Sequence, residues 1–123
     1  MNISDEMLFK HELKCSPDSF SIRSVNIEAE SGGYVIDIVF KVAYSDLINI
    51  VNGIGLYQVA PNEINPYTAT SIPDIQEILI GQMSQDTNRV LFFSNINEKS
   101  CCRKKILYDM ETGIAYYQNL NYN

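Results

Sequence analysis

The clearest pattern in the chain is an alternation of apolar and polar residues between Ser19 and Ser45, with the period of two that is typical of β-strands. The segment Glu30-Ser-Gly-Gly33 divides this region, because its glycines accept the positive φ angles of a tight turn. The pattern therefore predicts a β-hairpin. Its return strand places one apolar set on a single face: Tyr34, Ile36, Ile38, Phe40, Val42 and Tyr44.

The first strand of this hairpin changes its alternation partway along. A regular strand would place its two apolar groups on opposite faces of the sheet. One extra residue, accommodated as a β-bulge, brings both groups back to one face. We therefore predict a bulge at residues 23–24, with the apolar side chains of both groups turned inward. These side chains are Phe20 and Ile22 before the bulge, and Val25, Ile27 and Ala29 after it.

Residues 6–15 also alternate, and two interpretations compete there. The alternation favours a strand. A short helix is supported by Ser4 as an N-cap and by Asp5 and Glu6 in the first turn. We favour the strand, which Pro17 would end.

Two apolar runs, Leu47–Val51 and Ile54–Val59, are separated by Asn52-Gly53, a dipeptide typical of hairpin turns. We expect a second, shorter hairpin here, or a strand entered through a loop. Residues 60–70 hold two prolines and two asparagines, which predicts the longest loop of the chain.

Helical spacing is clearest at residues 72–84, where apolar residues recur every three or four positions. Ser71 is a suitable N-cap, Pro73 suits the first turn, and Asp74 and Glu77 suit the positive end of a helix. These features predict the principal helix.

Three more strands are expected in the last third of the chain, at Arg89–Ile96, Lys104–Met110 and Ile114–Tyr122. Strands that are sequence neighbours with short turns usually pair antiparallel. We predict a single α+β domain over residues 1–123. It would hold a mainly antiparallel, twisted, meander-like sheet of six or seven strands with the helix at about 72–84 packed on one face.

Acidic residues dominate most of the chain. Residues 1–98 hold 13 Asp and Glu against 5 Lys and Arg, whereas four cations lie within Lys99–Lys105, and the net charge is −6. This balance argues against nucleic-acid binding, which needs cations across a whole face, and favours attraction to basic partners. The chain also lacks a long apolar stretch and a cationic, apolar N-terminal signal, and it has an odd number of cysteines. We therefore expect a cytoplasmic protein that does not bind a membrane.

Residues suited to catalysis are sparse. His11 is the single histidine and Cys15 its nearest thiol, and on a strand these residues would lie about 13 Å apart. Cys101 and Cys102 adjoin cations that lower a thiol pKa, but they lack the C-x-x-C spacing of metal ligands. We expect no enzymatic activity, no metal and no cofactor. A small hydrolase with two carboxylates stays open as an alternative, because such carboxylates meet only in the folded chain.

Two resemblances to known families bear on function. In size, acidity, Ile- and Asn-rich composition and lack of a catalytic motif, the chain resembles bacterial immunity proteins, such as those of contact-dependent inhibition systems. In order of elements it is similar to SecB-type export chaperones, from Phe20-Ser-Ile-Arg through Tyr57-Gln-Val and Pro66-Tyr67 to a helix and the strand of Val90–Asn97. The C-terminal hairpin, Ile106–Tyr122, departs from the chaperone family, which ends in a helix. Neither resemblance assigns site residues.

The charge pattern and the first resemblance together predict a small acidic binding protein that neutralises a basic macromolecular partner. The expected role is that of an immunity or antitoxin-like protein that covers the active cleft of a cognate nuclease or similar toxin. A SecB-like chaperone or adaptor, and the small hydrolase, are the alternatives. The candidate partner-binding residues are acids of the first hairpin and the helix, with two tyrosines as anchors: Glu28, Glu30, Asp37, Asp74, Glu77, Asp86, Tyr116 and Tyr117.

Overall fold

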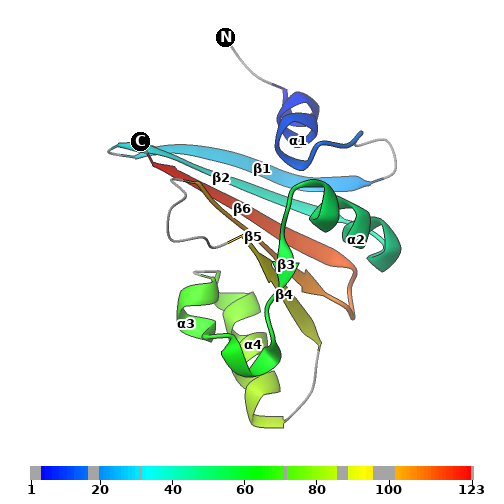
Figure 1. Ribbon diagram of the computed structural model, residues 1–123, viewed down its shortest axis with the longest axis vertical. Coiled ribbons are helices and arrows are strands. Elements are labelled where there is room, and N and C mark those ends of the chain that lie inside the picture. Colours follow the sequence, from blue (N-terminus) through cyan, green and yellow to red (C-terminus); the bar gives the residue numbers. More distant parts are fainter. Residues whose placement is uncertain are drawn as a thin grey trace.

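The computed structural model describes residues 4–16, 20–30, 32–70, 72–85, 89–95 and 102–122. Its centre is a six-stranded antiparallel sheet with the strand order β1-β2-β6-β5-β4-β3 (Figure 1). The predicted α+β class is therefore confirmed. The order is not a meander throughout, because the last strand lies between β2 and β5. The strands are β1 (Ser21–Glu30), β2 (Gly33–Lys41), β3 (Tyr57–Gln58), β4 (Val90–Ser94), β5 (Cys102–Asp109) and β6 (Ile114–Tyr122).

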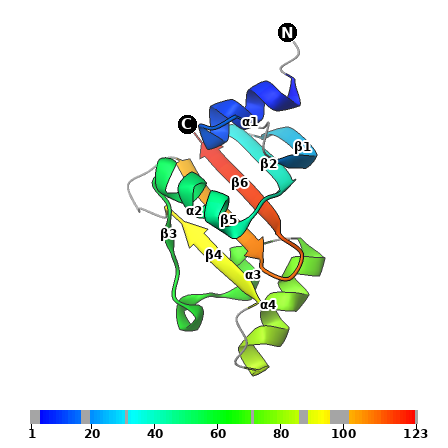
Figure 2. The same ribbon diagram turned by 90° about the vertical axis from the view of Figure 1, so that its right-hand side faces the viewer.

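Helices lie on both faces of the sheet, as Figures 1 and 2 show. Helices α1 (Asp5–Leu13) and α2 (Tyr44–Gly53) cover one face, which we call the helical face. The short α3 (Pro66–Ala69) and α4 (Pro73–Gln85) pack on the other face against β4 and β5, and a 3-10 turn, η2 (Pro61–Glu63), precedes α3. No helix in the described part of the chain combines the length and apolarity that a membrane crossing requires.

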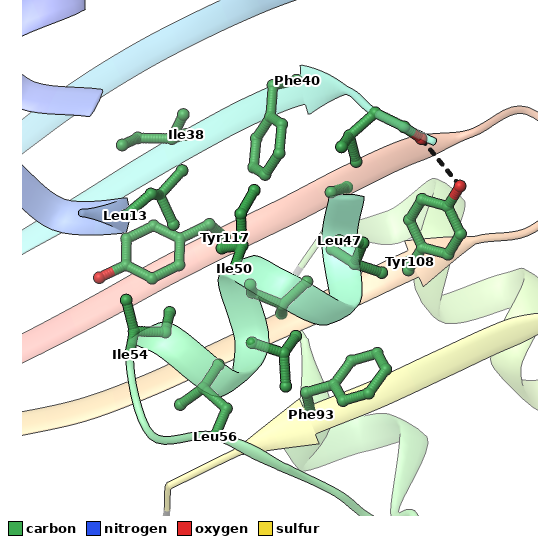
Figure 3. Close-up of a cluster of buried hydrophobic side chains, with 14 of the residues drawn as sticks. Leu13, Ile38, Phe40, Leu47, Ile50, Ile54, Leu56, Phe93, Tyr108 and Tyr117 are labelled. Atoms are coloured by element: carbon green, nitrogen blue, oxygen red, sulfur yellow. Dashed lines mark hydrogen bonds between the residues drawn. The ribbon is translucent and has the colours of Figure 1, made fainter. Parts of the chain in front are cut away.

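The larger core lies between the helical face and α1 and α2 (Figure 3). Leu47 and Ile50 of α2 enter it from above the sheet, and Phe40 lies on the strand side. The Tyr108 hydroxyl donates a 2.8 Å hydrogen bond to the carbonyl of Val42, where the chain leaves β2 for α2. This bond satisfies the polar end of a buried aromatic side chain. A smaller core holds α3 and α4 to β4 and β5.

The predicted bulge in β1 is confirmed, since the register with β2 shifts between Ile22 and Ser24. Beyond the shift, Val25 pairs with a residue of the helical face, so both apolar groups do share that face. Their burial follows the prediction only in part. Phe20, Ile22 and Val25 pack against the core, but Ile27 is 49% exposed and Ala29 is exposed as well. The tip of the hairpin extends past α1, which covers only the first half of β1 (Figure 1).

The strand predicted at residues 6–15 is wrong, because Asp5–Leu13 forms the competing helix α1. The Ser4 side chain accepts a hydrogen bond from the Met7 amide at 3.2 Å, as an N-cap does. The helix buries Leu8, Phe9, Glu12 and Leu13, a set with helical spacing. Met7, which the alternation grouped with Phe9, is 63% exposed.

The hairpin predicted over residues 47–59 is also wrong. Helix α2 buries Leu47, Ile50 and Val51, which recur at intervals of three and four. Asn52-Gly53 ends this helix instead of joining two strands, and the strand that follows is only the two-residue β3. The expected loop at 60–70 contains η2 and α3. Helix α4 and strands β4 to β6 agree closely with the predicted ranges.

Candidate protein-binding face

The face of the sheet opposite α1 and α2 is only partly covered. Among the described residues, the apolar contacts of α3 and α4 on this face reach β4 and β5, with Tyr116 of β6 at their border. The remaining surface of β1, β2 and β6 is what we call the open face. By the strand register, its side chains include those of Ser24, Asn26, Glu28, Val35, Asp37, Val39, Lys41, Ile114, Tyr116, Gln118 and Leu120.

Polar side chains form a row across the open face. The register places Asn26 opposite Asp37, and Asp37 opposite Gln118. The Gln118 side-chain amide donates a 2.9 Å hydrogen bond to Asp37 Oδ1, and the Asn26 amide donates one of 3.3 Å to Glu28 Oε1. Both carboxylates are therefore held in place by neutral donors. They keep free lone pairs and their charge for an outside partner.

The start of α4 continues this surface. Burial raises the pKa of the half-buried Tyr116, and the negative charges of Asp109 and Asp74 raise it further. Asp74, which is exposed in the first turn of α4, therefore lies close enough to Tyr116 for its charge to act on the hydroxyl group. A shallow depression lined by Ile72, Tyr116, Asp37 and other residues joins the helix start to the sheet.

Four of the eight predicted partner-binding residues therefore lie on or beside one surface: Glu28, Asp37, Asp74 and Tyr116. Glu77 is exposed on α4, three residues after Asp74. Glu30 ends β1 at the hairpin tip, and Asp86 lies outside the described residues.

Tyr117 is a correction to the predicted set. Its side chain is 1% exposed and packs in the larger core, beside Leu13 in Figure 3. Side chains alternate between the faces of a strand, so Tyr116 points to the open face and Tyr117 to the helical face. Tyr117 therefore offers no side-chain surface to a partner.

Cations border the open face on the β5 side. Arg103 pairs with Leu120, and Lys105 pairs with Gln118, so both belong to this side of the sheet. Burial lowers the pKa of Lys105, while the nearby charge of Asp37 acts in the opposite direction. Among the described residues, the open face therefore carries negative charge at Glu28, Asp37 and Asp74, and positive charge on β5 and at Lys41, the last residue of β2.

A cavity of about 290 Å³ lies between residues 59–69 and strands β4 and β5. Its lining includes Arg103, Lys104 and Lys105 and, among the described residues, one carboxylate, that of Glu63. The two-carboxylate hydrolase would require a second acid there. His11, the other group considered for catalysis, lies exposed on α1 across the sheet from this cavity.

A buried polar cluster on the helical face was not predicted. Glu12 of α1, 4% exposed, accepts hydrogen bonds from the Tyr117 hydroxyl at 3.1 Å and from the Asn119 amide at 2.6 Å. The cluster connects α1 to the centre of the sheet. Assigning residues 6–15 to a strand concealed it, whereas helical spacing would have placed Glu12 on the buried side beside Leu8.

The cysteine next to α1 is a weak candidate for nucleophilic chemistry. Burial raises the pKa of the Cys15 thiol, which lowers the fraction of reactive thiolate at neutral pH. In the described ranges, no group of three or more His, Cys, Asp or Glu side chains is arranged to hold a metal ion.

Comparisons with known proteins find no matching family, no similar curated protein and no matching solved structure. The function proposed below is therefore inferred from the geometry of the open face.

Proposed function

We propose that this protein binds and neutralises a basic protein partner, in the manner of an immunity or antitoxin-like protein that covers the cleft of a toxin. The observation that carries the proposal is that Asp37 and Asp74 lie near the half-buried Tyr116, with Glu28 further along the same sheet face, on a surface that α3 and α4 cover only in part.

The chemistry of the open face suits this role. A toxin that acts on nucleic acid presents cations to its substrate, and an acidic surface that occupies the same cations excludes the substrate without any chemical step. Carboxylates steer the encounter and raise the association rate. Tyr116 would supply an anchor, because partly buried tyrosines are common among the residues that dominate binding energy.

The test is affinity capture followed by kinetics. Wild-type protein is immobilised beside a triple variant, Glu28→Gln, Asp37→Asn and Asp74→Asn, and both are exposed to a lysate of the source organism. A control triple variant, Asp5→Asn, Glu6→Gln and Glu63→Gln, removes the same charge from exposed acids elsewhere. We expect a basic protein that wild type and control retain and the open-face variant loses.

The captured protein is then purified, and its association rate is measured from low to high salt. Steered complexes associate about 100-fold or more faster than unsteered ones at low salt, so the wild-type rate should fall steeply with salt and the open-face variant should be slower at low salt. Addition of the protein should also inhibit the activity of the partner. An acidic partner, a salt-independent association rate, or equal binding by both triple variants would contradict the proposal.

A further inference from the structure

The outer edge of β1 is a long strand edge with little protection. β1 ends the sheet on one side, and Ser24–Glu30 pairs with β2 without interruption. Natural sheets usually protect such edges with short strands, prolines, lysines or bulges. The opposite edge strand, β3, has only two residues. In β1 the bulge protects one end and Glu28 and Glu30 add charge, but Ser24–Glu30 contains no proline and no lysine.

The register determines which amides point outward from this edge. Glu30 and Gly33 are the last pair before the turn, and a pair next to a two-residue turn exchanges hydrogen bonds directly. Every second residue before Glu30 therefore bonds to β2. The amides of Val25, Ile27 and Ala29 point away from it, and their side chains lie on the helical face, where Ile27 is 49% exposed.

We propose that this edge pairs with the β1 edge of a second copy of the chain, antiparallel, about a two-fold axis at Asn26. Each Val25 then faces the second copy's Ile27, and each Ser24 faces the second copy's Glu28. The exposed Ile27 side chains become covered, and the two six-stranded sheets form one continuous sheet. This inference is independent of the proposed function.

Charge along β1 favours a second copy as the occupant. Arg23 lies at one end of the edge and Glu28 toward the other. At a bulge, two residues oppose one on the neighbouring strand, so Arg23 accompanies Ser24 opposite Val39. In the antiparallel pair, Ser24 faces the second copy's Glu28, and opposite charges therefore meet at both ends of the interface.

Other arrangements of two copies lack this match. Parallel pairing in register would place the Glu28 side chains of the two copies next to each other, where their negative charges repel. A slip of one residue turns Ile27 toward the polar side chains of the second copy. The interface is small, because a single strand contributes most of it, and we expect a weak dimer that depends on concentration.

The first experiment measures mass as a function of concentration. Sedimentation of the purified chain from about 10 μM to about 1 mM should show a rise from one mass of 14.0 kDa toward twice that value. Ile27→Pro removes an outward amide and leaves the bonds to β2 intact, so it should stay monomeric while keeping its circular dichroism spectrum. Ile27→Thr keeps the amide and should still dimerise, more weakly. A wild type that stays monomeric throughout, or an Ile27→Pro variant that dimerises as wild type does, overturns the proposal.

The second experiment tests the register. In a background with the three native cysteines replaced by serine, Asn26→Cys sits on the two-fold axis, where a non-bonded antiparallel pair has Cα atoms about 4.5 Å apart. That separation suits a disulfide, so mild oxidation should give a covalent dimer. The matched control, Glu6→Cys on exposed α1, should give far less. Equal cross-linking of both variants overturns the assigned register.

The third experiment tests the charge match. Arg23→Glu and Glu28→Arg should each weaken dimerisation about tenfold, and the double exchange should restore it. Failure of the double exchange to restore dimerisation would show that these two side chains do not face each other.

Discussion

Replacement of Asp109 by asparagine should destabilise the fold, because this carboxylate is buried and held by charged and backbone donors. Asp109 is 3% exposed. Arg89 donates from Nε to Oδ1 and from Nη2 to Oδ2, both at 2.9 Å, and the Glu111 amide donates to Oδ1 at 3.0 Å. The pair joins the residue before β4 to the end of β5.

The size of the effect follows from these contacts. Asparagine keeps the shape, but it turns an amide group toward the guanidinium and removes the buried counter-charge of Arg89. Hydrogen bonds to charged groups contribute about 1.5–3 kcal/mol. The Arg89 side chain is 35% exposed, so water compensates part of the loss. We expect the free energy of unfolding to fall by about 2–3 kcal/mol, which for 123 residues is about 8–12 °C in Tm.

The pH dependence distinguishes this mechanism from a packing defect. Burial alone would raise the pKa of Asp109, but hydrogen bonds from Arg89, the Glu111 amide and Thr112, with the charge of Arg89, hold the pKa below its ordinary value. A carboxyl group with a lowered pKa stabilises the folded state above its unfolded pKa, and this contribution is lost as the pH falls through the folded pKa. The difference between wild type and Asp109→Asn should therefore be constant above about pH 6 and shrink below about pH 4.

The assay is urea unfolding followed by circular dichroism, at pH 7, 5 and 3. Arg89→Met and the double variant complete a mutant cycle that isolates the coupling between the two side chains. A cost below about 0.5 kcal/mol at pH 7, or a cost that is unchanged at pH 3, would refute this account of Asp109.

Three further substitutions probe other parts of the fold. Gln82, 7% exposed, donates to the Val90 carbonyl at 3.0 Å and accepts from its amide at 2.7 Å, so Gln82→Ala should cost about 2–3 kcal/mol in urea unfolding; a neutral result would mean that this contact does not stabilise β4. Gly113 has φ +74° with room for a Cβ atom, so Gly113→Ala should cost about 1 kcal/mol through backbone strain alone, and a thermal shift above about 10 °C would argue for a clash instead. Ser4→Ala should cost about 1 kcal/mol and Ser4→Asp much less, and equal losses in thermal melts would remove the N-cap assignment.

Local features of the sequence predicted the elements whose pattern has a single structural solution. The bulge in β1 follows from a change of parity, which a strand can accommodate in few other ways. Helix α4 has an apolar stripe over three turns. Helices α1 and α2 are nine and ten residues long, and runs of that length fit both periods. Contact with the sheet decides in favour of the helix.

The candidate site depends on long-range pairing, which the sequence does not reveal. The individual acids could be named in advance, but the placement of Asp37 and Asp74 near Tyr116, with Glu28 on the same sheet face, requires β6 to lie next to β2. The same placement decides which tyrosine is exposed. Tyr116 and Tyr117 are neighbours with the same side chain, and only the pairing of β6 assigns one to the open face and the other to the core.

The position of β6 in the sheet also affects how the chain can fold. This strand is synthesised after the other five, yet it joins the hairpin of β1 and β2 to the block formed by β5, β4 and β3. Until β6 leaves the ribosome, no strand joins the two blocks. The inner edge of β2 stays unpaired until then, because its partner residues lie more than 70 positions later in the chain, as in the pairing of Ile38 with Tyr117. Such distant contacts slow folding and prolong the exposure of apolar surface. The nascent chain is therefore most prone to aggregate until β6 has left the ribosome and paired with β2 and β5.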